Sequence, residues 1–203
     1  MLVEKRFLPL YISLFSIFAL FGISMTVIGA TLPKIFAEFG WSYMTAGIVI
    51  AAGSIGYFLS SYLAGILFPF LGIRLTISLS LILICCGLEL FARTPIAWLN
   101  MMLYFIIGVG QGGIEIAVDW AVLRMEGPGG GKAMSLMHGA FSIGAVVGPL
   151  IIAILISANL EWTLVYRIIG ILFLGLAIFM QFMPLKFLGK DRARITNRSR
   201  RDL

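Results

Sequence analysis

Long apolar runs separated by short polar breaks extend along almost the whole chain. Each run holds about 20 or more residues, the length that an α-helix needs to cross roughly 30 Å of hydrocarbon. The pattern predicts an all-α membrane protein with six transmembrane helices in one bundle over 1–185 and a separate tail at 186–203. The predicted spans are 7–32, 44–67, 73–91, 95–123, 133–158 and 162–184.

The same pattern contains a weak internal repeat. A shift of 88 residues places Gly22 on Gly110, and Ser54-Ile55-Gly56 on Ser142-Ile143-Gly144. This shift maps the first three spans onto the last three. Because each copy has an odd number of spans, the second copy is inverted in the membrane. We therefore expect a 3+3 inverted repeat.

Small residues form strips along spans two and five. The strips include Gly56 and Gly65 in span two, and Gly144, Gly148 and the adjoining Pro149 in span five. Small residues four positions apart let helix backbones approach closely. Ordinary packing inside the bundle explains each pair by itself. Because the repeat makes the two helices equivalent, a contact between subunits is an equally weighted alternative.

Composition and charge support a membrane protein and give it an orientation. Mean hydropathy is +1.06, and 12% of residues are charged, whereas soluble domains carry about 25%. Seven of the fifteen Lys and Arg residues follow Pro184. The positive-inside rule places both termini in the cytoplasm, with the spans in an inner or plasma membrane. A basic tail beside a membrane helix indicates contact with anionic lipid rather than with nucleic acid.

Two segments resemble the major facilitator superfamily. The turn after span two keeps Gly65, Leu67, Gly72 and Arg74 of the family pattern Gly-x-Leu-x-Asp-Arg-x-Gly-Arg-Arg, although Pro and Phe replace its Asp and first Arg. Span five contains Gly-x3-Gly-Pro, preceded by a His-Gly pair that is similar to the fucose and sugar permease branch. The resemblance implies half of a transporter fold, the N-terminal six helices. The altered turn puts the family's cytoplasmic gating latch in question.

Span four carries a polar stripe in an otherwise apolar helix. Gln111, Glu115 and Asp119 are each four residues apart, so they spread over about 80° of the helix, with Tyr104 on the same side. Tyr104 stands where the family usually has a buried Arg. The stripe predicts a surface that faces the bundle interior or a water-filled cavity. Glu115 matches the acidic residue that the sugar-permease resemblance implies for proton coupling; the alternative is a protonated Glu that bonds a neighbouring helix.

Two further polar groups have a structural and a functional interpretation each. We expect Asp119, near the cytoplasmic end, to form a salt bridge with Arg74 or Arg124 that acts in gating. His138, one turn into span five, suits proton exchange near neutral pH, but a hydrogen-bonded structural histidine is the commoner case. The adjacent Cys85 and Cys86 have no metal-binding spacing, so we expect neither a metal nor a cofactor.

These observations favour a half-size secondary transporter that moves a small solute by alternating access. We expect proton coupling and assembly as a parallel homodimer, because the two halves of such transporters are parallel repeats. One alternative is half of a split transporter, with a separate six-helix partner chain. Another is a membrane assembly or sensor module that does not transport. An enzyme is not expected, since the sequence has none of the common hydrolase motifs.

Overall fold

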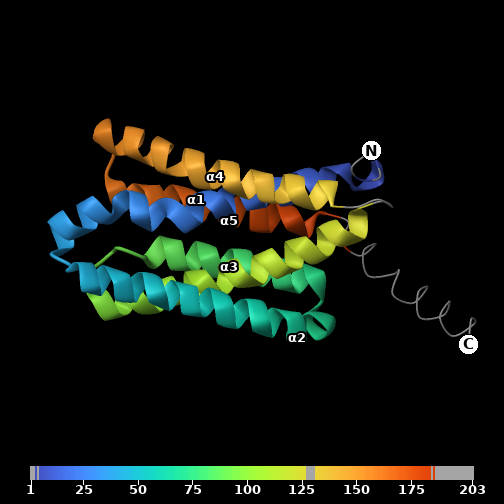
Figure 1. Ribbon diagram of the computed structural model, residues 1–203, viewed down its shortest axis with the longest axis horizontal. Helices are drawn as coiled ribbons and strands as arrows, with labels where there is room; N and C mark the ends of the chain where they lie inside the picture. Colours follow the sequence, from blue (N-terminus) through green and yellow to red (C-terminus); the bar gives the residue numbers. More distant parts are fainter. Residues whose placement is uncertain (1–2, 4, 127–130, 184, 186–203) are drawn as a thin grey trace, which may run out of the picture.

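The computed structural model describes residues 3, 5–126, 131–183 and 185, and within them the chain is helical. A short 3-10 turn at Lys5–Phe7 leads into five α-helices that run along one long axis (Figure 1). The helices are α1 (Leu8–Phe39), α2 (Tyr43–Leu90), α3 (Ala97–Met125), α4 (Lys132–Ser157) and α5 (Trp162–Gln181). The predicted basic tail at 186–203 lies outside the described residues.

The longest helix, α2, contains two spans joined at a sharp break. Gly72 has φ 73° and ψ 159°, a conformation open to glycine but rarely to residues with a side chain. We call Tyr43–Leu67 the first arm of α2 and Phe70–Leu90 the second arm. With both arms counted, the described residues form six helices long and apolar enough to cross a membrane. The prediction of six spans is confirmed.

The first helix is longer than its apolar run suggests. The sequence predicted an end at Leu32, but α1 continues to Phe39 with Pro33 inside it. Proline is tolerated in membrane helices because neighbouring groups compensate for the lost backbone hydrogen bond. The helix ends at Gly40, which has a left-handed φ of 64° and donates its N–H to the Phe36 carbonyl.

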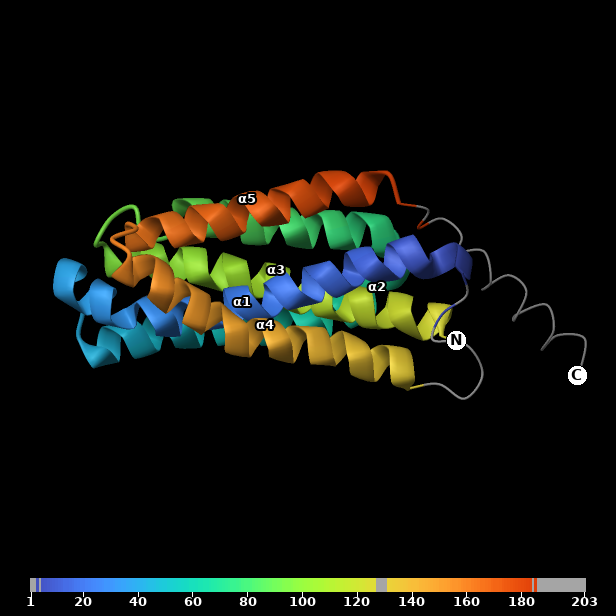
Figure 2. The same ribbon diagram turned by 90° about the horizontal axis from the view of Figure 1, so that it is seen from above.

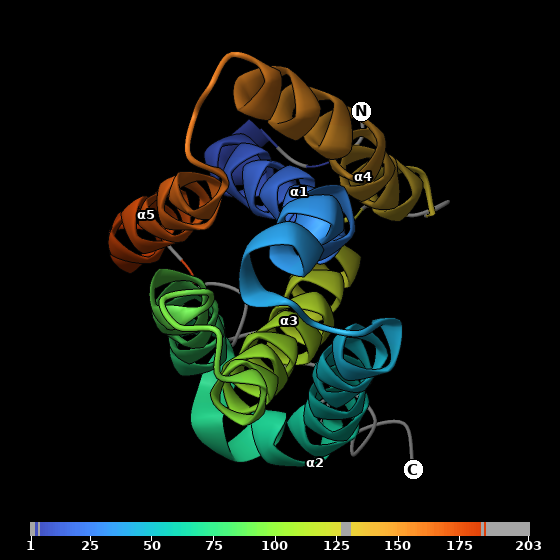
Figure 3. The ribbon, with the colours of Figure 1, turned by 90° about the vertical axis from the view of Figure 1, so that its left-hand side faces the viewer.

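The helices pack across the repeat rather than within it. In the two side views α1 lies beside α4 (Figure 1 and Figure 2), and α3 packs against both arms of α2 (Figure 3). Helix α5 packs on the second arm of α2 and joins the two groups. The first helix of each three-helix repeat therefore packs mainly on helices of the other repeat. The structure thus has the six-helix, 3+3 inverted-repeat fold that the sequence predicted.

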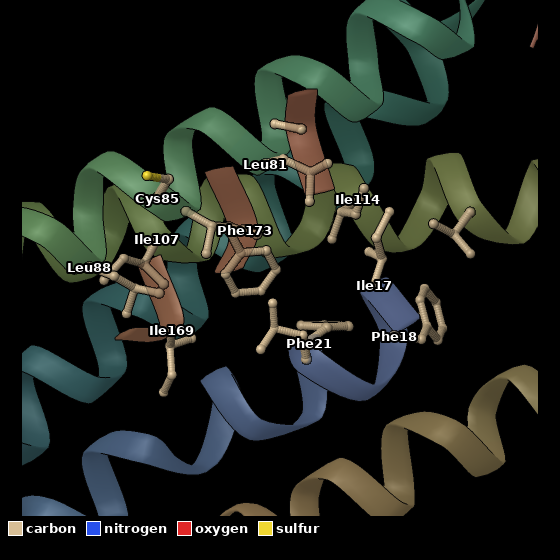
Figure 4. Packing of buried hydrophobic residues seen from close by; sticks show 14 of the residues in the cluster. Ile17, Phe18, Phe21, Leu81, Cys85, Leu88, Ile107, Ile114, Ile169 and Phe173 are labelled. Atoms are coloured by element: carbon tan, nitrogen blue, oxygen red, sulfur yellow. The ribbon is translucent and has the colours of Figure 1, made fainter. Parts of the chain in front are cut away.

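One apolar core is shared by all five α-helices. Figure 4 shows Phe18 and Phe21 of α1, Leu81 of α2, Ile107 of α3 and Phe173 of α5 gathered in it, each at most 2% exposed. Between membrane helices, van der Waals packing replaces transfer from water as the main attraction. The fit of these side chains therefore determines how the helices are arranged.

Glycines permit two close helix crossings. Where the first arm of α2 crosses α3, a β-carbon at Gly56 would collide with the carbonyl of Phe105, and one at Gly108 with that of Gly53. A side chain at either glycine would push the two backbones apart. This crossing fixes the spacing between the first arm and α3.

The second crossing, between α1 and α4, uses glycines of the predicted strip on span five for packing inside the bundle. A β-carbon at Gly144 would collide with the Ala19 carbonyl, and Gly148 lies against Ile23. These glycines, like Gly56, are engaged within the chain, because the inverted repeat interlocks the helices that carry them. Gly65 meets open space instead, and Pro149 is only partly buried inside α4.

Two arginines bind the second arm of α2 to α5 at opposite ends of the bundle. Arg74 donates to the main-chain carbonyls of Gln181 and Met183, the latter at 2.8 Å. Arg167 donates to two carbonyls at the end of the second arm, including that of Phe91 at 2.6 Å. Carbonyl groups at the ends of helices lack hydrogen-bond donors within their own helix, and each arginine supplies donors to two of them. The second arm and α5 are equivalent helices of the repeat, although the 88-residue shift does not place one arginine on the other.

Candidate functional site

Polar side chains gather between the first arm of α2, helix α3 and helix α4. Asp119 lies six residues before the end of α3 and His138 six residues after the start of α4, so both are about 9 Å inside their helix ends. Glu115 lies one turn deeper. The polar cluster consists of Tyr57, Ser61, Glu115, Asp119 and His138.

The deepest contact joins Glu115 to Tyr57. The phenol of Tyr57 donates to Oε2 of Glu115 and links the first arm of α2 to α3. The glycine crossing brings the two groups together, because Gly112 of α3 lies directly against the Tyr57 carbonyl. The carboxyl group of Glu115 is partly exposed and has a fixed neighbour.

Asp119 lies beside His138 rather than beside Arg74. Its Oδ1 is 3.7 Å from His138 Nε2, and this pair carries opposite charges only when the imidazole is protonated. The Phe18 ring packs edge-on against the imidazole with centroids 5.6 Å apart. Oδ1 is buried and makes no hydrogen bond to any described residue. The contact is one of few between α3 and α4.

The predicted salt bridge of Asp119 with Arg74 is therefore corrected. Arg74 uses its guanidinium on the carbonyls at the end of α5, because the break at Gly72 places it there. The Arg124 guanidinium stacks over the Trp120 ring at 4.2 Å. A gating role for these residues stays a prediction.

The side chains of the predicted polar stripe on α3 contact different helices. Gln111 is buried and donates to the Ser24 hydroxyl of α1 at 3.1 Å. Tyr104 is buried in the core, where its ring packs 5.5 Å from that of Phe91 and against Gly53. Because α3 is central, its successive turns meet different helices. Tyr104 therefore does not line the same surface as Glu115.

Sequence reasoning did not identify Tyr57 as the partner of Glu115. A usable signal was its place directly after Gly56, on a helix face where Gly53 and Gly56 indicate a close crossing. The Ser24 contact with Gln111 had no comparable signal. Among the described residues, no group of three or more His, Cys, Asp or Glu side chains is arranged to hold a metal ion.

The cluster borders a face that other helices of the chain leave uncovered. The first arm of α2 and helix α4 are the least buried spans and lie on the same side of the bundle (Figure 3). We define the open face as Ser54, Phe58, Ser61 and Gly65 of the first arm and Ser135, His138, Ser142 and Pro149 of α4. A charged group exposed to lipid at membrane depth costs about 2.5–3.5 kcal/mol or more. The face is therefore suited to a water-filled cavity or to another protein surface.

Curated relatives include transporters. "Sodium-dependent glucose transporter 1" of Rattus norvegicus is 26% identical over 141 residues, which are 70% of this chain and 28% of the rat protein. An uncharacterized MFS-type transporter of Yersinia pestis is 29% identical over 133 residues, or 64% of this chain and 34% of that protein. The chain thus matches about a third or less of the length of these relatives.

The family comparison covers nearly the whole chain. The model of the Major Facilitator Superfamily matches residues 14–202. This match agrees with the six membrane-spanning helices, the inverted repeat and the motif residues around Gly65 and Gly148. The chain is an integral membrane protein, and it belongs to the Major Facilitator Superfamily.

Proposed function

We propose that the chain forms one six-helix half of a secondary transporter that moves a small solute by alternating access. The observation that supports this most is the polar cluster beside the open face, in which Glu115, Asp119 and His138 lie partly exposed at membrane depth. Charged side chains are energetically unfavourable when they face lipid, whereas those that face a water-filled cavity commonly serve a function. A second six-helix unit that covers this face would enclose them in such a cavity.

We propose a second copy of the chain, in parallel orientation, as that unit. The halves of major facilitator transporters are related by an axis along the membrane normal, so two identical copies can reproduce their arrangement. Under this symmetry the first arm of one copy faces α4 of the other. A different six-helix chain is the alternative partner, and a non-transport module is the remaining one.

We propose Glu115 as the proton-coupling residue, with His138 and Asp119 completing the polar path toward the cytoplasm. The start of α1 and the end of α5 lie at the same end of the bundle (Figure 1), and the basic tail supports a cytoplasmic placement of that end. Four curated relatives are named sodium-dependent glucose transporters. Glucose is therefore the first probe solute, and sodium is the competing coupling ion.

Uptake of radiolabelled D-glucose by the reconstituted chain tests this function. We expect accumulation under an inward proton gradient, and we expect Glu115→Gln to reduce it about tenfold or more because the side chain can no longer exchange a proton. Glu38→Gln is the matched control, since Glu38 is exposed near the end of α1. Uptake driven only by a sodium gradient would show that sodium, and not the proton, is the coupling ion. Gradient-driven uptake that Glu115→Gln leaves unchanged would remove Glu115 from the mechanism.

A further inference from the structure

The contact between Tyr57 and Glu115 depends on an unusually close helix crossing. Gly108 of α3 faces the Gly53 carbonyl and Gly112 faces the Tyr57 carbonyl, so a β-carbon at either glycine would overlap the main chain of the first arm. When two helix backbones lie this close, a side chain on one helix can reach groups on the other. The phenol of Tyr57 uses this reach to donate to Oε2 of Glu115.

The symmetry-related crossing of α1 with α4 shows that such a crossing does not need this polar pair for packing. Helices α1 and α4 cross with Gly144 against the Ala19 carbonyl, and the 88-residue shift relates this crossing to that of the first arm with α3. The positions equivalent to Tyr57 and Glu115 hold Ala145 and Val27. One of the two equivalent crossings thus has apolar residues at these positions, while the other carries a phenol and a carboxyl group.

We propose that Tyr57 is a positioning residue that holds the Glu115 carboxyl group in the orientation required for ion-coupled transport. This inference rests on the coupling role proposed for Glu115. The phenol belongs to the first arm of α2, which contributes to the open face, and the carboxyl group belongs to the central helix α3. The hydrogen bond therefore connects the coupling group to the helix that a second six-helix unit would touch.

Other groups near Glu115 are arranged differently. Asp119 lies one turn along α3 and contacts His138 of α4, while Ser61 lies one turn after Tyr57 on the first arm. The structure gives Asp119, His138 and Ser61 no hydrogen bond to the carboxyl group of Glu115, whereas Tyr57 has one. The phenol is thus the side chain that fixes the direction of the carboxyl group.

Infrared difference spectroscopy of the reconstituted chain tests the contact without reference to transport. The carboxyl band of Glu115 is identified as the band that Glu115→Gln removes. We expect Tyr57→Phe to shift this band, because the carboxyl group loses a hydrogen-bond donor. The matched control Tyr62→Phe should leave it in place, since Tyr62 is 66% exposed on the same arm. An unshifted band in Tyr57→Phe would overturn the proposal.

A second variant tests the same contact if Tyr57→Phe does not fold. Gly112→Ala retains the phenol but forces the first arm away from α3, so it should shift the same band. Glucose uptake separates this proposal from the proposed function. We expect Tyr57→Phe to reduce uptake toward the level of Glu115→Gln. Uptake lost in Glu115→Gln but unchanged in Tyr57→Phe overturns the positioning role alone, whereas uptake insensitive to Glu115→Gln removes the coupling role.

Discussion

Single arginine side chains bind the second arm of α2 to α5 at both ends of the bundle. Arg167 is half-buried and places its two terminal nitrogens on carbonyls at the end of the second arm. The planar guanidinium reaches two acceptors at once, whereas a lysine ammonium is a compact donor on a flexible stem. The contact therefore depends on the shape of the group as well as on its charge.

Arg167→Lys should lower the free energy of unfolding by about 1–2 kcal/mol, because at least one buried carbonyl loses its donor. Arg93→Lys provides the control, since Arg93 is exposed and its contacts, with the Glu89 carboxylate at 4.0 Å and the Glu89 carbonyl at 2.7 Å, lie at the surface within one helical turn. Its effect should stay under about 0.5 kcal/mol. Thermal unfolding in detergent micelles measures both. Equal losses in the two variants would contradict the role of the reciprocal arginines.

At the scale of single residues, the sequence identified the side chains that are energetically unfavourable inside a membrane, but not the groups that they contact. Glu115, Asp119 and His138 were found because polar residues inside apolar spans require an explanation. Pairing depends on how each helix is rotated and on which helix crosses it, and neither follows from spacing along one span. The sequence therefore assigned Arg74 or Arg124 to Asp119, although the structure places Arg74 on the end of α5.

Whole helices were predicted more completely than side-chain contacts. Length and apolarity are local properties, so the six spans could be read directly from the chain. The continuation of α1 through Pro33 and the sharp link at Gly72 depend on neighbouring helices and on one glycine conformation. The interlocking of the repeats likewise appears only when the helices are assembled, and it explains why Gly144 packs on α1.

Helix α4 offers a matched pair of glycines for testing the crossing with α1. Gly144→Ala should destabilise the protein by about 1–3 kcal/mol, because the added β-carbon meets the Ala19 carbonyl and neither backbone can yield cheaply. A β-carbon at Gly139 meets nothing within 4 Å. Gly139→Ala should therefore be neutral or stabilising by up to about 1 kcal/mol. Thermal unfolding measures the stability of both variants. Equal stabilities would contradict the close crossing of α1 and α4.

The whole molecule combines a symmetric scaffold with an asymmetric site. Interlocked repeats and reciprocal arginines make the six helices one packed unit, whereas the polar cluster draws on α2, α3 and α4. The cluster lies beside the open face rather than in the apolar core. A partner unit over that face would convert an unfavourable membrane surface into an enclosed polar cavity.

Crosslinking in a bilayer tests that arrangement most directly. Ser54 and Ser142 are exposed on the open face, are related by the 88-residue shift and occupy similar depths. In chains with Cys85 and Cys86 replaced, we expect Ser54→Cys in one copy to crosslink with Ser142→Cys in another. Ile171→Cys on α5 should crosslink with neither, because this exposed residue lies on a different helix from the open face. A chain that stays monomeric in the bilayer, with no crosslink between positions 54 and 142, would contradict the proposed pairing.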